Sequence, residues 1–193
     1  MIKLKTLLSL LFIAVTAISC ELENKKSDKG WNLVLRDGLL YSDSLTIEPF
    51  TGHYKGKVMG KSIEYDVVDG KRNGIFILYN ENGYVETFGY LKDNKNHGEW
   101  KYYYPNGELE SVGIFYDDKP DSLWNWFYMN GKILQEGWCN EGNKDGEWKF
   151  YDEFENLTLF LKYNNDILID SVNFKVKLDD RIIGLDTLSL NTE

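Results

Sequence analysis

The sequence predicts an all-β fold, an extended antiparallel sheet made of tandem β-hairpins that recur at one fixed interval. Three columns of residues keep this interval, which is 124 − 100 = 24 positions: Trp100, Trp124 and Trp148; Gly83, Gly107 and Gly131; and Gly89, Gly113 and Gly137. A common interval in several columns means that one supersecondary unit has been copied in tandem. Each copy then packs its apolar side against the next copy, not around a central core.

Each unit contains an aromatic strand, an Asn-Gly turn and a second strand. Asn-Gly is the strongest short-range signal for a hairpin, because both residues tolerate the positive φ angles of a two-residue type I′ turn. With such a turn at Asn82-Gly83, facing residues have numbers that sum to 165. The large rings then face strand glycines, in the pairs Phe76 with Gly89, Trp100 with Gly113, and Trp124 with Gly137. We expect each ring to cover the glycine that it faces.

Alternation along the strands separates two faces of the sheet. The drier face is predicted to carry Phe76, Leu78, Trp100, Tyr102, Trp124, Trp126, Trp148 and Phe150. The other face mixes charged residues with a stripe of rings formed by Tyr79, Tyr103, Phe127 and Tyr151. This stripe has two interpretations, a structural ladder of strand-forming residues or a binding surface.

The two ends of the array are expected to differ from its regular part, as terminal repeats usually do. We expect a repeat domain over residues 31–178, which an N-terminal unit with a turn at Asp37-Gly38 opens. The last unit is predicted to be irregular, because Phe154 stands where a turn glycine is expected. A final strand is predicted from Val172 to Leu178, and residues 179–193 are predicted to form a loose tail.

The first residues are predicted to direct export. Residues 1–19 have a basic start, a short apolar stretch and small residues at their end, which is typical of a secretory signal peptide. Small residues directly before Cys20 resemble the lipobox of bacterial lipoproteins, which implies that Cys20 becomes the lipid-carrying first residue. Residues 20–30 are then a flexible tether between the outer membrane of the cell envelope and the repeat domain, which is either periplasmic or exposed at the cell surface. The alternative is an ordinary signal peptide that is cut nearby.

Composition restricts the partners. Without Lys3 and Lys5 of the signal, 22 − 2 = 20 basic residues face 31 acidic ones, a net charge of −11. Nucleic acid is not expected as a partner, since phosphate backbones require a basic surface. If Cys20 carries lipid, Cys139 is the only remaining thiol, and we expect it to be a small buried residue.

No catalytic, metal or cofactor site is predicted. The two histidines, His53 and His97, have no zinc-ligand spacing, and no serine elbow or phosphate-binding glycine loop is present. Glu86 and Glu110 recur at the repeat interval, which on a sheet more often indicates a solvated edge than a carboxylate pair.

The unit that begins at Gly98-Glu-Trp-Lys-Tyr-Tyr-Tyr-Pro-Asn-Gly107-Glu-Leu resembles the bacterial variant of the MORN repeat. The resemblance implies an extended sheet of hairpins and says little about function. Some relatives are described as antitoxin-like, and better-known MORN proteins act as scaffolds or membrane-proximal modules. This chain departs from the pattern at Ser122, which replaces the unit glycine, and in the irregular stretch Lys55–Asp69.

Four short motifs resemble an O-glycosylation sequence of exported bacterial proteins, in which a hydroxyl residue follows an aspartate and precedes an aliphatic residue. Their hydroxyl residues are Ser44, Ser122, Ser171 and Thr187. The other interpretation is that aspartate and serine serve there as turn residues that lead into strands.

These observations favour a non-catalytic module for protein interaction or scaffolding at the cell envelope. A glycan-binding surface protein and an antitoxin-like or immunity partner of a toxin are the alternatives.

Overall fold

The computed structural model describes residues 33–174, and these residues are all-β. The predicted signal peptide, the tether and the tail from residue 179 onward lie outside this range. The strands, in chain order, are β1 (Val34–Arg36), β2 (Leu39–Tyr41), β3 (Gly52–Val58), β4 (Lys61–Val68), β5 (Lys71–Tyr79), β6 (Val85–Lys92), β7 (Lys95–Asn96), β8 (Gly98–Tyr103), β9 (Leu109–Tyr116), β10 (Lys119–Phe127), β11 (Ile133–Asn140), β12 (Asn143–Tyr151), β13 (Leu157–Asn164) and β14 (Ile167–Asn173).

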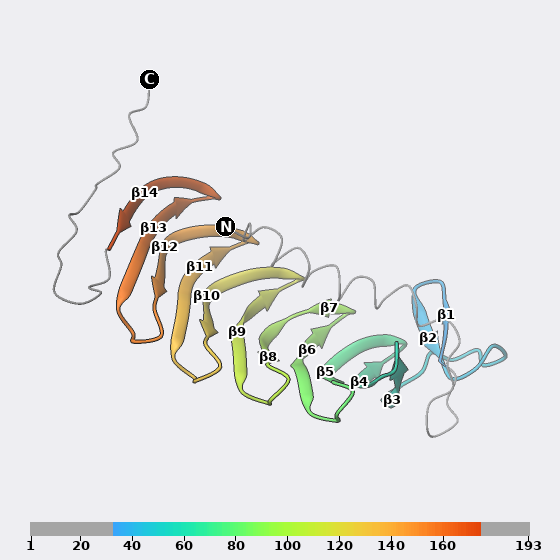
Figure 1. The fold of residues 1–193 in the computed structure, drawn as a ribbon. Helices are drawn as coiled ribbons and strands as arrows, with labels where there is room; N and C mark the ends of the chain where they lie inside the picture. The colour runs from blue at the N-terminus through green and yellow to red at the C-terminus, as the bar shows by residue number, and fades with distance from the viewer. Residues whose placement is uncertain (1–32, 175–193) are drawn as a thin grey trace.

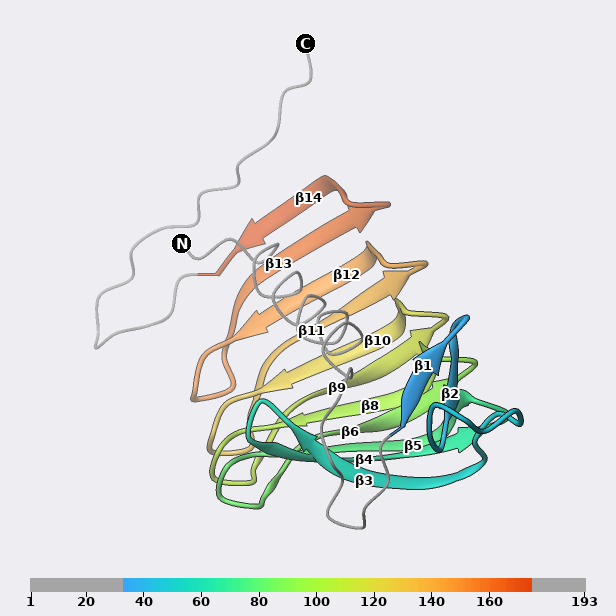
Figure 2. The same cartoon turned by 90° about the vertical axis from the view of Figure 1, so that its right-hand side faces the viewer.

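Strands β3 to β14 form one antiparallel meander of 12 strands within the described residues. Apart from the short β7, which lies off this path, the order of the strands in space follows their order in the sequence (Figures 1 and 2). Strands β7 and β8 both pair with β6, with His97 between them. The predicted fold class, an extended sheet of hairpin repeats, is confirmed.

The predicted register is confirmed, although the predicted turn type is wrong. Phe76 pairs with Gly89, Trp100 with Gly113, and Trp124 with Gly137. The first loop is longer than two residues, because the Gly83 N–H donates to the Asn80 carbonyl at 3.0 Å and the Asn80 N–H donates to the Tyr84 carbonyl at 2.8 Å. Only the glycine has a positive φ, 83°, as in a type I turn that ends in a glycine bulge.

A β-bulge next to this loop restores the predicted pairing. Leu78 pairs with Thr87 but Tyr79 pairs with Val85, so Glu86 is the extra residue of the bulge. The longer loop shifts the register by one residue, and the bulge shifts it back. The same combination recurs in the next two hairpins.

Type I′ turns lie at the opposite edge of the sheet. Asp93 and Asn94 have φ angles of 50° and 69°, and Asp117 and Asp118 have 49° and 69°. Each of these turns also bridges to the preceding unit. The Asp118 N–H donates to the Asn96 carbonyl at 3.0 Å, and Asp118 Oδ1 accepts the Asn96 N–H at 2.7 Å.

The bridge between the β11–β12 turn and the preceding unit is made by Gly142 and Pro120 in place of an Asn or Asp and its partner. The Gly142 N–H donates to the Pro120 carbonyl at 2.8 Å, as its counterparts do. Gly142 has no side chain to accept a second bond, and Pro120 has no N–H to donate one. The missing acceptor at Gly142 and the missing donor at Pro120 therefore occur in the same bridge, and no backbone donor is left without an acceptor there.

The indole rings of the drier face cover strand glycines, but not the ones predicted. A Cβ added at Gly113 would overlap the ring of Trp124, which belongs to the next hairpin, and Gly89 and Gly137 have the same relation to Trp100 and Trp148. The Trp124 Nε1–H also donates to the Ile114 carbonyl of the preceding strand, at 3.2 Å. The prediction that each ring covers its hairpin partner is wrong, because the ring leans toward the neighbouring unit.

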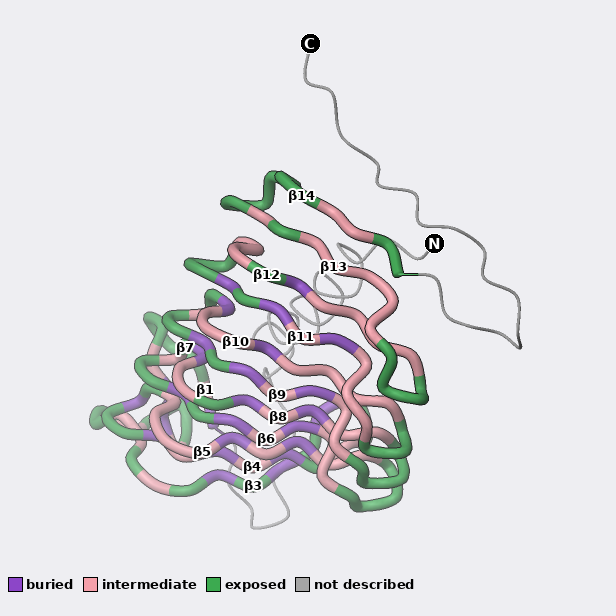
Figure 3. Tube along the Cα trace, turned by 90° about the vertical axis from the view of Figure 1, so that its left-hand side faces the viewer, coloured by how far each residue is buried: buried purple, intermediate pink, exposed green. Residues whose placement is uncertain are grey.

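The rings of this face form a continuous row. Neighbouring ring centroids from Phe76 through Trp100, Phe115, Trp124, Trp126 and Trp148 to Tyr163 lie 5.1–6.2 Å apart. Trp100 and Trp148 are fully buried and Trp124 nearly so. Figure 3 shows buried segments on successive strands of the sheet. The predicted assignment of the drier face is confirmed.

The N-terminal unit is separate from the long sheet. Strands β1 and β2 form their own two-stranded sheet, so the prediction that this unit opens the sheet is wrong, and β3 opens it instead. The unit docks on the β4–β5 turn, where the Leu40 N–H donates to the Gly70 carbonyl and the Gly70 N–H donates to the Phe50 carbonyl, both at 2.8 Å. The stretch from Lys55 to Asp69, which looked irregular in the sequence, forms regular paired strands.

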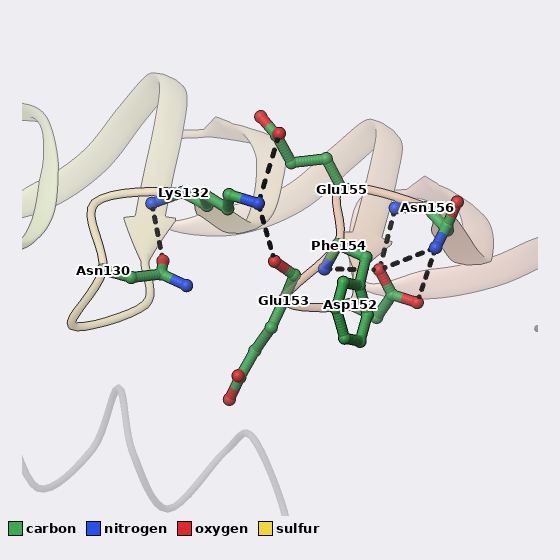
Figure 4. Close-up of polar contacts among 7 residues, drawn as sticks. All are labelled: Asn130, Lys132, Asp152, Glu153, Phe154, Glu155 and Asn156. Carbon is green, nitrogen blue, oxygen red and sulfur yellow. Dashed lines mark hydrogen bonds and ion pairs between the residues drawn. The ribbon is translucent and has the colours of Figure 1, made fainter.

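The hairpin of the last unit, β12–β13, keeps the geometry of the earlier ones. Glu155, one repeat interval after Gly131, occupies the left-handed position with a φ of 68°, so the predicted irregularity at Phe154 is wrong. Asp152 Oδ1 accepts the N–H groups of Phe154 and Asn156 and holds the turn (Figure 4). The final described strand is Ile167–Asn173, earlier than the predicted Val172–Leu178, of which residues 175–178 lie outside the described range.

Ser122 also keeps the conformation of the glycine that it replaces. Its φ is 60°, in the left-handed region that Gly98 and Gly146 adopt at the same position. The Ser122 hydroxyl donates to Asp121 Oδ1 at 2.9 Å. The substitution therefore leaves the bulge intact and places a strained residue in it.

Candidate interaction surface

The four predicted stripe residues occupy equivalent positions on alternate strands. Tyr79, Tyr103, Phe127 and Tyr151 end β5, β8, β10 and β12, and each is half-buried. Each pairs across its hairpin with an aliphatic residue: Val85, Leu109, Ile133 and Leu157 respectively. Opposed residues of an antiparallel pair share a face, so these residues form four apolar pairs, which we call the apolar band.

The aliphatic half of the band was not predicted. These residues recur at the repeat interval, two positions after the left-handed residue of each turn, so the same periodicity could have identified them. Their partly exposed, repeated placement makes the band a surface that four hairpins present together.

Two phenols of the band, those of Tyr79 and Tyr151, have raised pKa values. Burial, followed by the hydrogen bond to Glu136, raises the pKa of Tyr151 to about 12, and its hydroxyl donates to Glu136 Oε1 at 2.9 Å. Burial and then the charge of Glu64 raise the pKa of Tyr79. The band consists of aromatic and aliphatic side chains and contains no acidic or basic residue.

Carboxylates flank the band at the bulges. Glu86 is ion-paired with Lys61 at 2.6 Å. Glu110 is partly buried, and its burial, followed by repulsion from Glu86, raises its pKa. Glu110 at this edge is therefore only partly solvated. A partly buried carboxyl with a raised pKa occurs at functional sites and also in structural networks.

Charged residues of the neighbouring row are paired within the sheet. Lys101 lies 2.7 Å from Glu99, and Lys149 lies 3.3 Å from Glu147 and 3.8 Å from Glu136. Such exposed pairs contribute about 0–1 kcal/mol each to stability. Both lysines of this row are thus paired with carboxylates.

A second apolar column lies on the same face, nearer the type I′ turns. Tyr90, Ile114 and Trp138, each directly after a strand glycine, are exposed by 43%, 42% and 50%. This column was also missed, although it recurs at the same interval as the other columns. It is broken by charged residues at the flanking units, Asp66 and Lys162.

The two histidines lie in different environments. His53 is held between two carboxylates, with Nδ1 2.7 Å from Asp66 Oδ1 and Nε2 3.1 Å from Glu64 Oε2. His97 Nδ1 lies 3.4 Å from Asp117. Among the described residues, no group of three or more His, Cys, Asp or Glu side chains is placed to hold a metal ion.

The single described cysteine is a packing residue. Cys139 is buried, and its burial raises the pKa of its thiol to about 12. A thiol with so high a pKa is largely protonated at neutral pH and is a poor nucleophile.

The motifs that resemble glycosylation sequences differ in accessibility. Ser44 lies exposed in the loop between β2 and β3. Ser122 and Ser171 are half-buried within β10 and β14. Thr187, like the predicted lipidation residue Cys20, lies outside the described residues. Of the described positions, Ser44 is the one that an enzyme could reach most readily.

No described segment is a helix that is long and apolar enough to cross a membrane. No curated protein matches the chain.

Similar solved structures share only a loose likeness. They include a TarM mutant from S. aureus in complex with Fondaparinux, alpha-GlcNAc-glycerol and UDP (TM-score 0.30, 9% identity, 60% of this chain and 20% of that one). Accessory secretory proteins 1, 2 and 3 of Streptococcus pneumoniae have a TM-score of 0.32 at 15% identity, over 70% of this chain and 24% of theirs. The Gap123 glycosylation-associated complex of Streptococcus agalactiae has a TM-score of 0.33 at 12% identity, over 74% of this chain and 24% of the other. The chain thus spans about a quarter of these proteins or less, and scores this low support no functional argument.

A family model supports the repeat unit itself. The model described as MORN repeat variant matches residues 96–118. This stretch contains β8, its turn, β9 and the following type I′ turn, which together make one hairpin with its link to the next. The chain therefore contains a MORN repeat variant at residues 96–118.

Proposed function

We propose that this protein is an exported, lipid-anchored repeat protein whose sheet acts as a non-catalytic interaction module at the cell envelope. The apolar band is the observation that supports the interaction role. Four hairpins present the same pair of a ring and an aliphatic residue, partly exposed and uncharged. Aromatic residues surrounded by polar neighbours are the usual energetic centre of protein interfaces.

The partner is expected to be a protein with a basic surface around an apolar contact. The net charge of −11 after removal of the signal would steer such a partner toward the module. An antitoxin-like or immunity role is one form of this proposal, and it requires one tight basic partner.

A pull-down from the native envelope tests the interaction surface. We expect the wild-type chain to recover a partner that Phe127→Lys in the band does not recover. The matched control is Leu168→Lys, which adds the same charge on β14 at a site that is 37% exposed. Recovery of the same partner by both variants would place the interface elsewhere.

Radioactive palmitate tests the anchor separately. We expect label on the full chain and its loss in the Cys20→Ala variant. An unlabelled wild-type chain would refute the lipoprotein proposal and leave the interaction proposal standing.

Glycan binding is the second candidate, because the rings of the band recur at every second strand. That spacing is about 9–10 Å along the sheet, given strands that lie ~4.8 Å apart. Stacking of sugar rings would change tryptophan or tyrosine fluorescence on addition of glycans. A glycan array without hits and an unchanged emission spectrum would exclude this candidate.

A further inference from the structure

The loop between β2 and β3 exposes two large aliphatic side chains at the N-terminal end of the molecule. Leu45 and Ile47 are 89% and 88% exposed, more than any other large hydrophobic side chain in the described residues. Single exposed apolar residues are common on soluble proteins. Two of them on one loop, separated by one residue, form a small apolar tip.

Hydrogen bonds hold this loop in shape. Asp43 Oδ1 accepts the N–H groups of Leu45 and Thr46, both at 2.8 Å. The hydroxyls of Ser42 and Thr46 lie 3.0 Å apart, and Arg36 Nη2 donates to the Thr46 carbonyl at 2.8 Å. Because Thr46 is bonded back to the body of the unit, the residues on either side of it stay directed outward.

The loop belongs to the part of the described chain that is nearest to the predicted anchor. The described residues begin at Leu33, 13 positions after Cys20. A chain of this length spans at most about 45 Å when fully extended. The loop projects from the end of the molecule next to β3, whereas the exposed aliphatic residues of β14 lie at the opposite end (Figure 1).

We propose that Leu45 and Ile47 insert into the surface of the bilayer that holds the lipid at Cys20. The inference rests on the proposed anchor. Aliphatic side chains on a preformed loop can enter the headgroup region and add to the affinity of a lipid anchor. Asp43 and Glu48 flank the tip, so the contact relies on apolar burial and not on attraction to anionic lipids.

The experiment replaces the natural anchor, so that it does not depend on lipidation. Residues 21–193 carry an N-terminal hexahistidine tag and bind phosphatidylcholine vesicles that contain a nickel-chelating lipid. An environment-sensitive fluorophore is attached at Leu45→Cys, in a Cys139→Ser background. The matched control carries the fluorophore at Met129→Cys, an exposed tip residue of the β10–β11 turn. Circular dichroism and melting curves verify that each variant folds like the unlabelled chain.

We expect the probe at position 45 to shift its emission to the blue and to be quenched by lipids with nitroxide-labelled acyl chains, while the probe at position 129 changes little. Leu45→Ser with Ile47→Ser should weaken vesicle binding by about tenfold or more, since two aliphatic side chains lose their burial. The same change at Leu168 and Ile169 of β14 should have no effect. Binding should persist in high salt.

Equal signals at positions 45 and 129, or unchanged binding of the serine variant, would refute the inference. Palmitate labelling of the full chain decides the anchor independently. A labelled chain with an unquenched loop would refute only the loop contact, and an unlabelled chain with a quenched loop would refute only the natural anchor.

Discussion

Neighbouring units are joined by different means in the middle of the strands and at the type I′ edge. In the middle, a Trp ring of one hairpin lies on a glycine of the preceding hairpin. At the edge, an Asn or Asp side chain of the turn accepts the backbone N–H of a residue in the preceding unit. The first contact depends on shape and the second on hydrogen bonding.

The exceptions show what each region tolerates. In the first unit Tyr65 takes the place of the glycine and Phe76 that of the tryptophan, so a larger residue accompanies a smaller ring. At the edge, Gly142 and Pro120 remove an acceptor and a donor together. In both regions, where a residue of one unit departs from the repeat, the residue that it contacts in the neighbouring unit departs as well. Replacing only one of the two should therefore destabilise the sheet.

The largest expected effect is in the middle of the strands. Gly113→Val forces a side chain into the space of the Trp124 ring, and overpacking of this kind lowers the free energy of unfolding by about 1–3 kcal/mol. Urea denaturation followed by tryptophan fluorescence measures it. Gly113→Tyr should be at least as harmful alone, and Trp124→Phe should partly rescue it by copying the pair Tyr65–Phe76. An unaffected Gly113→Val variant would show that the ring does not lie on this glycine.

The bridge at the type I′ edge should contribute less. Asp118→Ala leaves the buried Asn96 N–H without its acceptor, which destabilises by about 1–3 kcal/mol, near the lower end because the turn is close to water. Pro120→Ala should be mildly destabilising, because it adds an N–H that faces Gly142. Gly142→Asn should restore stability in that background but not in the wild type. Additive effects of these two changes would contradict the complementary pairing.

Relief of backbone strain should give a smaller, stabilising effect. Ser122→Gly removes a side chain from a left-handed position and should raise the free energy of unfolding by about 1 kcal/mol. Glu155→Gly, in the turn between β12 and β13, should act in the same direction. Gly98→Ser provides the reverse control and should destabilise. Thermal melting of the three variants under one buffer condition measures these shifts.

The smallest expected effect concerns pH at the first strand of the sheet. The hydrogen bond to Asp66, with help from Glu64, raises the pKa of His53 above its ordinary value of 6.5. Protonated His53 therefore stabilises the fold fully below pH 6.5, and this contribution disappears as pH rises through the folded-state pKa. We expect the melting temperature of the wild type, relative to His53→Gln, to fall across that range. Parallel pH profiles of the two proteins would contradict this role of His53.

The sequence predicted the repeat, the strand pairs and the drier face, because these follow from periodicity alone. The pairing of Trp100 with Gly113 survived an error about the turn, since the longer loop and the bulge at Glu110 shift the register in opposite directions. The side toward which the ring leans was not predictable, because every inner strand has two neighbours and alternation does not distinguish them. The apolar band was half-predicted, since the rings were noticed and the aliphatic residues at the same interval were not.

The meander also determines how this protein can fold. Each strand finds its partners within the adjacent stretch of chain, so closing any pair costs little loop entropy, and topologies of this kind fold fast for their size. Structure can begin at any hairpin and spread to both sides. Because no pairing among the described strands joins distant parts of the chain, the described sheet can assemble hairpin by hairpin as the chain lengthens.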